Sequence, residues 1–197
     1  EKARKEKGLA TMLCPAPTGM KGDWLVRKLL RERFLGDIHS IHVRALDDRW
    51  ADPTTPFHWR LDPDIAGVNT LAIGLYVECV HRWFGGTRRI NAVMRTCIPY
   101  RRDPATGKLR KTEHPDVVLA HGEMESGALV SYEFGGVHRH GGCAPQGKST
   151  IEAYGSEGTL KYVVGEDTIV GARAGDMETI PMPDEVGRPW TVENDWI

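Results

Sequence analysis

The 197-residue sequence lacks several features that would assign it at once to a functional class. Its four cysteines are far apart and form no C-x-x-C pair, which favours a reduced, cytoplasmic protein over a disulfide scaffold. The formal net charge is −1, so the composition gives no reason to expect a nucleic-acid or anionic-membrane partner. The best apolar run, 70–77, is too short to span a bilayer, and no signal peptide is visible. We therefore expect a cytoplasmic globular protein.

The sequence also lacks the G-x-G-x-x-G turn of dinucleotide-binding domains. Residues 142–149, GCAPQGKS, do fit the P-loop pattern G-x-x-x-x-G-K-S. A P-loop needs a helix after it, but 150–154 has strand character, and Pro145 removes one of the backbone N–H donors. We interpret 142–149 as a loop at a sheet edge.

A small group of possible zinc ligands lies beside that loop. His138, His140 and Cys143 are close in sequence, and His121 could approach them. Histidines in glycine-rich loops are more often ordinary polar residues than ligands, so no metal site is expected.

The chain is organised around residues 58–86. An almost entirely apolar helix is expected over 70–84, and a helix that is apolar on all sides is buried on most of its surface. The pair Gly85-Gly86 ends it, as glycine commonly does. A polar loop and a small-residue bend at Ala66-Gly67 precede the helix. Polar groups beside a buried helix, where the backbone can approach a ligand, form a plausible binding site.

Three residues before or at the start of this helix are candidates for that site. The guanidinium of Arg60 can grip a carboxylate or vicinal hydroxyls, and Trp59 supplies an apolar wall. The alternative for Arg60 is a salt bridge to Asp62 or Asp64. Asn69 could bind a hydroxyl or simply cap the helix.

Two further candidates lie within the helix. Tyr76 could present its hydroxyl to a ligand or be an ordinary core residue. Glu78 is four residues before Arg82, the spacing of a helical ion pair, and we favour that structural role over a place in the site.

The order of the remaining elements predicts an α+β fold: an open, mostly antiparallel sheet with helices packed on one face. Asp23 is expected to cap the helix 24–34, and the basic run 101–111 to be a solvated hairpin tip. The tail after residue 180 is proline-rich and shows little regular structure. The other expected elements are a helix over 1–7, strands over 9–13, 38–46 and 89–100, and hairpins over 117–124/128–134 and 149–154/159–164.

Three segments resemble motifs of the glucose-fructose oxidoreductase / inositol dehydrogenase (Gfo/Idh/MocA) family. The first is the Trp59-Arg60 loop, followed by part of a glycine run and by a helix that carries G-x-Y and ends in W-x-G. The second is a helix leading through Gly36-Asp37-Ile38 into a strand, and the third is IEAYGSEGTL at 151–160. Ala72 stands where the family usually has aspartate.

The resemblance implies that 14–197 is the substrate-binding and oligomerisation domain of an NAD- or NADP-dependent oxidoreductase, incomplete at its C-terminus, and that the parent acts on a sugar, inositol or related polyol. Residues 1–13 would be the last helix and strand of a Rossmann domain that holds the cofactor, with no cofactor bound by this chain alone. The catalytic lysine would lie upstream, because Lys2 is too close to the 9–13 strand. The implied polyol-binding residues are Trp59, Arg60, Asn69, Tyr76 and Glu78, and the open sheet face would form a homo-oligomer. The alternative is a non-catalytic ligand-binding or assembly module, which Ala72 favours, and this chain by itself is not expected to be active.

Overall fold

The fold is known from a computed structural model of the chain. It describes residues 2–8, 10, 20–67, 71–141, 149–164 and 166–181, and every structural statement below concerns these residues.

An open sheet of eight strands forms the body of the molecule, in the order β10-β9-β8-β7-β1-β6-β5-β2. Its central strand β1 runs parallel to β6, and every other neighbouring pair is antiparallel. The hairpin β3–β4, which follows β2 and precedes β5 in the sequence, forms a separate two-stranded sheet. The strands are β1 (Ile38–Leu46), β2 (Thr87–Arg95), β3 (Tyr100–Arg102), β4 (Leu109–Lys111), β5 (Val117–Met124), β6 (Leu129–Gly135), β7 (Thr150–Gly155), β8 (Thr159–Val163), β9 (Thr168–Ala172) and β10 (Glu178–Thr179).

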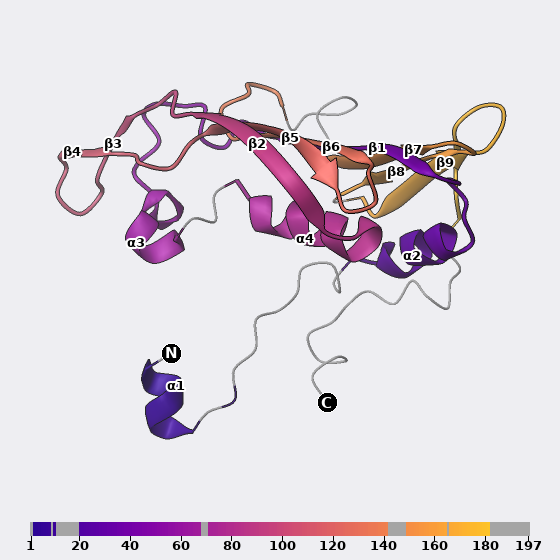
Figure 1. Cartoon of the computed structure of the whole chain (residues 1–197). Helices are drawn as coiled ribbons and strands as arrows, with labels where there is room; N and C mark the ends of the chain where they lie inside the picture. The colour runs from indigo at the N-terminus through magenta and orange to yellow at the C-terminus, as the bar shows by residue number, and fades with distance from the viewer. Residues whose placement is uncertain are drawn as a thin grey trace.

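The helices α2 and α4 lie against the same face of this sheet, and the described residues place no helix on the opposite face (Figure 1). This arrangement confirms the α+β prediction. No helix among the described residues has the length and apolar character needed to cross a bilayer. The helical segments are α1 (Lys2–Lys7), α2 (Asp23–Arg31), the 3₁₀ turn η2 (Trp59–Leu61), α3 (Pro63–Ala66) and α4 (Ile73–Phe84).

Alternation along the strands explains why one face is covered. On β1, Ile41 and Val43 are buried while His42 and Arg44 are exposed on the other side. The register pairs Val43 with Tyr132 of β6 and with Ile151 of β7, so their side chains share the helix-covered face. The core is therefore a layer between the sheet and the two helices.

Most expected strands are present at the predicted positions. The strand 38–46 is confirmed with the same bounds, and the two hairpins at 117–134 and 149–164 are confirmed within one or two residues. The strand expected over 89–100 ends earlier, at Arg95, and the chain resumes as β3 at Tyr100. Strands β9 and β10 were not anticipated, and the predicted strand over 9–13 lies outside the described residues apart from residue 10.

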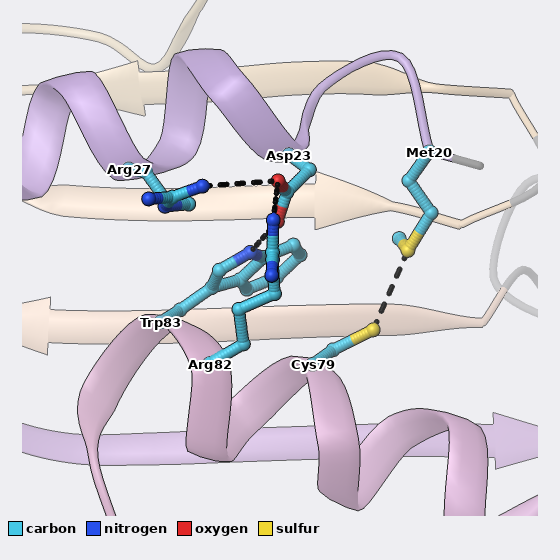
Figure 2. Close-up of polar contacts among 6 residues, drawn as sticks. All are labelled: Met20, Asp23, Arg27, Cys79, Arg82 and Trp83. Carbon is cyan, nitrogen blue, oxygen red and sulfur yellow. Dashed lines mark hydrogen bonds and ion pairs between the residues drawn. The ribbon is translucent and has the colours of Figure 1, made fainter. Parts of the chain in front are cut away.

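A buried carboxylate joins the two helices (Figure 2). Asp23, 7% exposed, accepts hydrogen bonds from Arg82 Nε at 2.9 Å and Nη2 at 3.0 Å, and from Trp83 Nε1 at 2.8 Å. Arg27 approaches the same carboxylate at 3.8 Å. A bidentate arginine and an indole together satisfy a carboxylate that would otherwise be costly to bury.

Two predictions are wrong at this junction. Asp23 is the first residue of α2 rather than its N-cap; the cap position is Gly22, with no side-chain hydrogen bond. The predicted partner of Arg82 was Glu78, but the guanidinium instead forms its two hydrogen bonds across to Asp23. The reason is burial: a desolvated bidentate pair is stronger than an exposed pair four residues apart on one helix.

The thiol of Cys79 completes the contact between the α2 segment and α4. It is fully buried and lies 3.4 Å from the Met20 sulfur (Figure 2). Burial raises the pKa of Cys79 to about 12. The thiol is therefore protonated at neutral pH and acts as a small apolar packing group rather than as a nucleophile.

Candidate functional site

A cavity of about 570 Å³ opens at the N-terminal end of α4. Its walls come from the loop that follows β1, from η2 and α3, from the start of α4, and from residues beside the ends of β5, β6 and β7. This volume lies within the range of small-molecule sites in proteins. The residues that line it are Ala45, Asp47, Arg49, Trp50, Trp59, Arg60, Leu61, Ile65, Ala66, Leu71, Ala72, Leu75, Tyr76, Pro115, Asp116, Gly135 and Ser149.

Three of the five predicted site residues meet in this cavity: Trp59, Arg60 and Tyr76. The Arg60 guanidinium lies 4.3 Å from the centroid of the Trp59 ring, a cation–π arrangement. Asp62, one alternative partner, is instead held by Arg110 at 2.7 Å and caps α3 by accepting from the Asp64 N–H. Within the described part of the chain, no ion pair engages Arg60, so its fork can face a ligand.

Tyr76 is 7% exposed and packs against Phe134 with ring centroids 5.7 Å apart. Burial raises the pKa of the Tyr76 phenol, and a hydrogen bond with the Ser149 side chain opposes that shift. The phenol therefore stays neutral at physiological pH. In that state it can donate a hydrogen bond to a hydroxyl of a ligand but is not a ready general base.

The other two predicted residues do not join this group in the structure. Asn69 lies outside the described residues. Glu78 is exposed and does not line the cavity. Helix geometry accounts for this, because two residues correspond to about 200° of rotation and place Glu78 on the opposite side of α4 from Tyr76.

The loop after β1 supplies a cavity residue that sequence reasoning missed, Trp50. Its backbone N–H donates to the Gly136 carbonyl at 2.8 Å. A Cβ on Gly136 would lie 2.5 Å from the Trp50 indole, so only glycine allows the ring to sit there. His58 lies between the two tryptophans, with ring centroids 5.4 Å from Trp50 and 5.4 Å from Trp59. Trp50 and Trp59 thus form an aromatic wall of the cavity, and the His58 ring bridges them from outside the cavity lining.

The remaining charges of the cavity are already satisfied. Asp47 and Arg49 form an ion pair at 2.9 Å. Both oxygens of Asp116 accept backbone N–H bonds, from Cys97 at 2.7 Å and Ile98 at 3.0 Å. What remains for a ligand is an aromatic wall, one guanidinium and the hydroxyls of Tyr76 and Ser149. This combination fits a polyhydroxylated ring, whose C–H faces stack on aromatic groups and whose hydroxyls need a few directed partners.

The entry into α4 has unusual backbone geometry. Leu71 and Ala72 adopt positive φ angles of 52° and 57°, and Ala72 is the N-cap without a side-chain hydrogen bond. The left-handed region is unfavourable for alanine and leucine but tolerated by aspartate and asparagine. Strained backbone of this kind is typical of binding sites, and Ala72 lines the cavity.

The weaker sequence motifs fall partly outside the described residues. Residues 142–148 of the P-loop-like segment, including Cys143 of the possible zinc group, lie outside the described residues. The segment that follows is strand β7, as expected, and not a helix. Across the ranges that the structure describes, no three His, Cys, Asp or Glu side chains are grouped as metal ligands.

Comparison with known proteins connects this geometry to a family. Residues 24–161 match the GFO/IDH/MocA C-terminal domain. Levoglucosan dehydrogenase of Pseudarthrobacter phenanthrenivorans is 31% identical over 152 residues, which cover 70% of this chain and 38% of the dehydrogenase.

Solved structures share the fold. Levoglucosan dehydrogenase in complex with NADH and levoglucosan superposes with a TM-score of 0.75 at 23% identity, covering 89% of this chain and 49% of that one. The super-repressor mutant of Gal80p from Saccharomyces cerevisiae superposes with a TM-score of 0.68 at 21% identity, covering 94% and 50%. The chain thus spans half or less of the length of these relatives. The matched residues make up well over half of the chain, and it belongs to the Gfo/Idh/MocA family, with the fold of the family's C-terminal domain.

Proposed function

We propose that this chain is the substrate-binding and oligomerisation domain of an NAD- or NADP-dependent oxidoreductase that acts on a sugar, inositol or related polyol. In the parent protein a separate dinucleotide-binding domain would hold most of the cofactor, and residues 1–13 would be its last helix and strand. The nicotinamide would supply hydride transfer, and the proton-transfer lysine would lie outside this chain.

The observation that carries the proposal is the convergence of Trp59, Arg60 and Tyr76 on one cavity, although the loop and the helix residue are 16 positions apart. The aromatic wall would stack on the apolar face of the substrate ring. Arg60 would orient vicinal hydroxyls, and the neutral phenol of Tyr76 would donate to one of them. Asn69, which lies outside the described residues, stays in the proposal as a residue that would bind a hydroxyl, and Glu78 only as a residue behind the site.

The test is an assay of the full-length parent against a panel of levoglucosan, myo-inositol, D-glucose and D-xylose with NAD and NADP. We expect oxidation of at least one polyol, and no turnover by the 197-residue chain alone. The coding sequence upstream should contain a glycine-rich nucleotide turn and an E-K-P motif. Absence of both, together with no turnover of any polyol, would overturn the proposal.

The open face of the sheet supports the proposed homo-oligomer. Val93, Leu119 and Leu129 expose 72%, 49% and 62% of their surface there, and Val93 pairs directly with Leu119 in the register. Satisfied ion pairs surround them, including Arg89–Glu123 at 2.8 Å and Arg44–Glu133 at 3.3 Å. Apolar residues within a frame of neutralised charges form a surface that a second copy of the same face can cover.

Light scattering on Leu119→Arg and Leu129→Arg variants tests this interface. We expect either substitution to lower the oligomeric mass at micromolar concentration, because it buries an unpaired charge in the interface. Leu109→Arg is the matched control, since Leu109 is 69% exposed but lies on the β3–β4 hairpin, away from the sheet face. If the wild-type full-length parent is a monomer in solution, the interface is excluded.

A non-catalytic module of the same fold is the second candidate, and Ala72 favours it. The family aspartate at this position would point a carboxylate at the cavity, whereas this chain presents a methyl group. Restoring the carboxylate with Ala72→Asp in the parent separates the two candidates. Suppose that the wild-type parent binds cofactor but oxidises no polyol, and that Ala72→Asp restores oxidation. The protein would then be a binding module that has lost catalysis.

A further inference from the structure

Arg101 on β3 is buried although it belongs to a basic run that the sequence predicts to be a solvated hairpin tip. The prediction is wrong for this residue: its exposure is 1%, whereas the adjacent Arg102 is exposed. Burial of a guanidinium carries a large desolvation cost, so something specific must offset it.

The partners of Arg101 all belong to one loop. Nη2 donates to the Trp50 carbonyl at 2.5 Å, and Nη1 donates to the carbonyls of Asp52 at 2.9 Å and Thr55 at 3.2 Å. The guanidinium carbon also lies 5.8 Å from the centroid of the Trp50 ring. The loop therefore curls around the planar guanidinium, which hydrogen-bonds three of the loop's carbonyls.

The same hairpin holds the far end of this loop and the turn after it by three further contacts. The Phe57 N–H donates to the Arg102 carbonyl at 2.8 Å. Arg110 of β4 stacks on the Phe57 ring at 4.2 Å and pairs with Asp62 at 2.7 Å. The hairpin thus holds the chain at Trp50 and on either side of the Trp59-Arg60 turn, and these residues line the cavity.

The backbone pairing of the separate β3–β4 hairpin does not involve the Arg101 guanidinium. β3 and β4 pair through their backbone registers, and the turn between them is closed by local bonds around Asp103. The arginine contacts instead hold a long irregular loop against the body of the protein. Irregular loops are ordered only where such contacts offset their conformational entropy.

We propose that Arg101 is a positioning residue of the polyol cavity: it fixes the 50–57 loop so that the Trp50 indole forms the wall of the site. It touches no ligand itself and acts through Trp50. The inference rests on the proposed function for the identity of the ligand, but the position of Trp50 can be tested without any ligand.

Fluorine NMR on the 197-residue chain labelled with 5-fluorotryptophan provides that test. Trp50→Phe and Trp59→Phe assign the two cavity resonances, and Trp24→Phe and Trp83→Phe assign two reporters on the helices. In Arg101→Met we expect the Trp50 resonance to shift or broaden while the Trp24 and Trp83 resonances stay in place. Arg102→Met is the matched control and should leave all four resonances unchanged. Among the described residues, that guanidinium hydrogen-bonds the Gly107 carbonyl of its own turn and no group of the 50–57 loop.

Arg101→Lys guards against loss of folding in the methionine variant. A lysine keeps the stem and a charge, but its single ammonium cannot span three carbonyls as the fork does. It should reproduce the selective change at Trp50. An unchanged Trp50 resonance in both variants would overturn the proposal, and so would global unfolding of both, since Arg101 would then serve the fold as a whole.

The ligand arm uses levoglucosan and myo-inositol as probes on the full-length parent. We expect Arg101→Lys to raise KM for the better substrate about tenfold with kcat changed much less, since loss of a binding wall weakens ground and transition states alike. A larger fall in kcat than rise in KM would contradict a positioning role. If the wild-type parent turns over neither of the two probes and no other polyol, the proposed function fails. The NMR test of Arg101 remains valid, because it uses no ligand.

Discussion

The C-terminal half of α4 buries Cys79, Val80 and Trp83 against the sheet and α2, whereas the N-terminal half borders a cavity of about 570 Å³. The C-terminal half is held by the buried carboxylate of Asp23, which accepts hydrogen bonds from Arg82 and Trp83. The N-terminal half follows two residues in the left-handed conformation, Leu71 and Ala72, and has no side-chain cap. One helix thus combines a rigid junction with a strained, open end, and the open end is where a ligand can bind.

The largest expected effect lies at the rigid end. Asp23→Ala leaves the Trp83 N–H and Arg82 without their partner, and we expect a loss of about 3 kcal/mol in the free energy of unfolding. This is at the low end for a buried pair because the Arg82 side chain is 35% exposed. Denaturant unfolding followed by circular dichroism measures it.

Asp37→Ala is the control for Asp23. Asp37 also pairs with an arginine, Arg33 at 2.8 Å, but its side chain is 81% exposed, so a change below about 0.5 kcal/mol is expected. Equal losses from the two variants would show that burial does not decide the strength of these pairs.

Alkaline pH should affect the two ends unequally. At the rigid end, burial and the neighbouring Asp167 carboxylate both raise the pKa of Tyr162. At the open end, burial raises the pKa of Tyr76, but the Ser149 hydroxyl opposes it. A raised folded-state pKa gives stability that is fully present below about pH 10, the value of an unfolded tyrosine, and lost as pH rises through the folded-state pKa.

We therefore expect the free energy of unfolding to fall steadily above pH 10. Tyr162→Phe should remove more of that decline than Tyr76→Phe does, because two effects act in the same direction at Tyr162. Urea midpoints between pH 8 and pH 11 measure it. If the free energy of unfolding falls more steeply with pH in Tyr162→Phe than in Tyr76→Phe, the stronger effect expected at Tyr162 is contradicted.

Tyr76→Phe at neutral pH removes one hydroxyl from the open end. With Phe134 still packed against the ring, we expect stability to change by about 1 kcal/mol or less. Under the proposed function, the affinity of the full-length parent for a polyol should fall about tenfold, which corresponds to the loss of one well-placed hydrogen bond. Calorimetric titration measures both wild type and variant, and an unchanged affinity would remove Tyr76 from the site.

The sequence predicts the sheet better than it predicts the contacts at either end of α4. Period-two alternation identified β1, and turn residues identified the two later hairpins, because these signals are local. Local signals also brought Trp59, Arg60 and Tyr76 forward as candidates. Trp50 and Arg101 were missed because their roles depend on contacts about 50 residues apart, between a loop and a hairpin that no short pattern connects. A charged residue in a basic run gives no sign of burial until its partners are placed.

The smallest expected effect concerns the strained entry to α4. Ala72 has φ 57°, and glycine adopts that conformation without steric cost, so Ala72→Gly should raise the free energy of unfolding by about 0.5–1 kcal/mol. Ala66→Gly is the matched control, because Ala66 lies within helical α3 and the same change there should lower stability by a similar amount. Opposite signs in the two thermal midpoints would place the strain at residue 72. A loss of stability in both variants would mean that the open end of α4 stores no strain at that residue and is held as firmly as the other end.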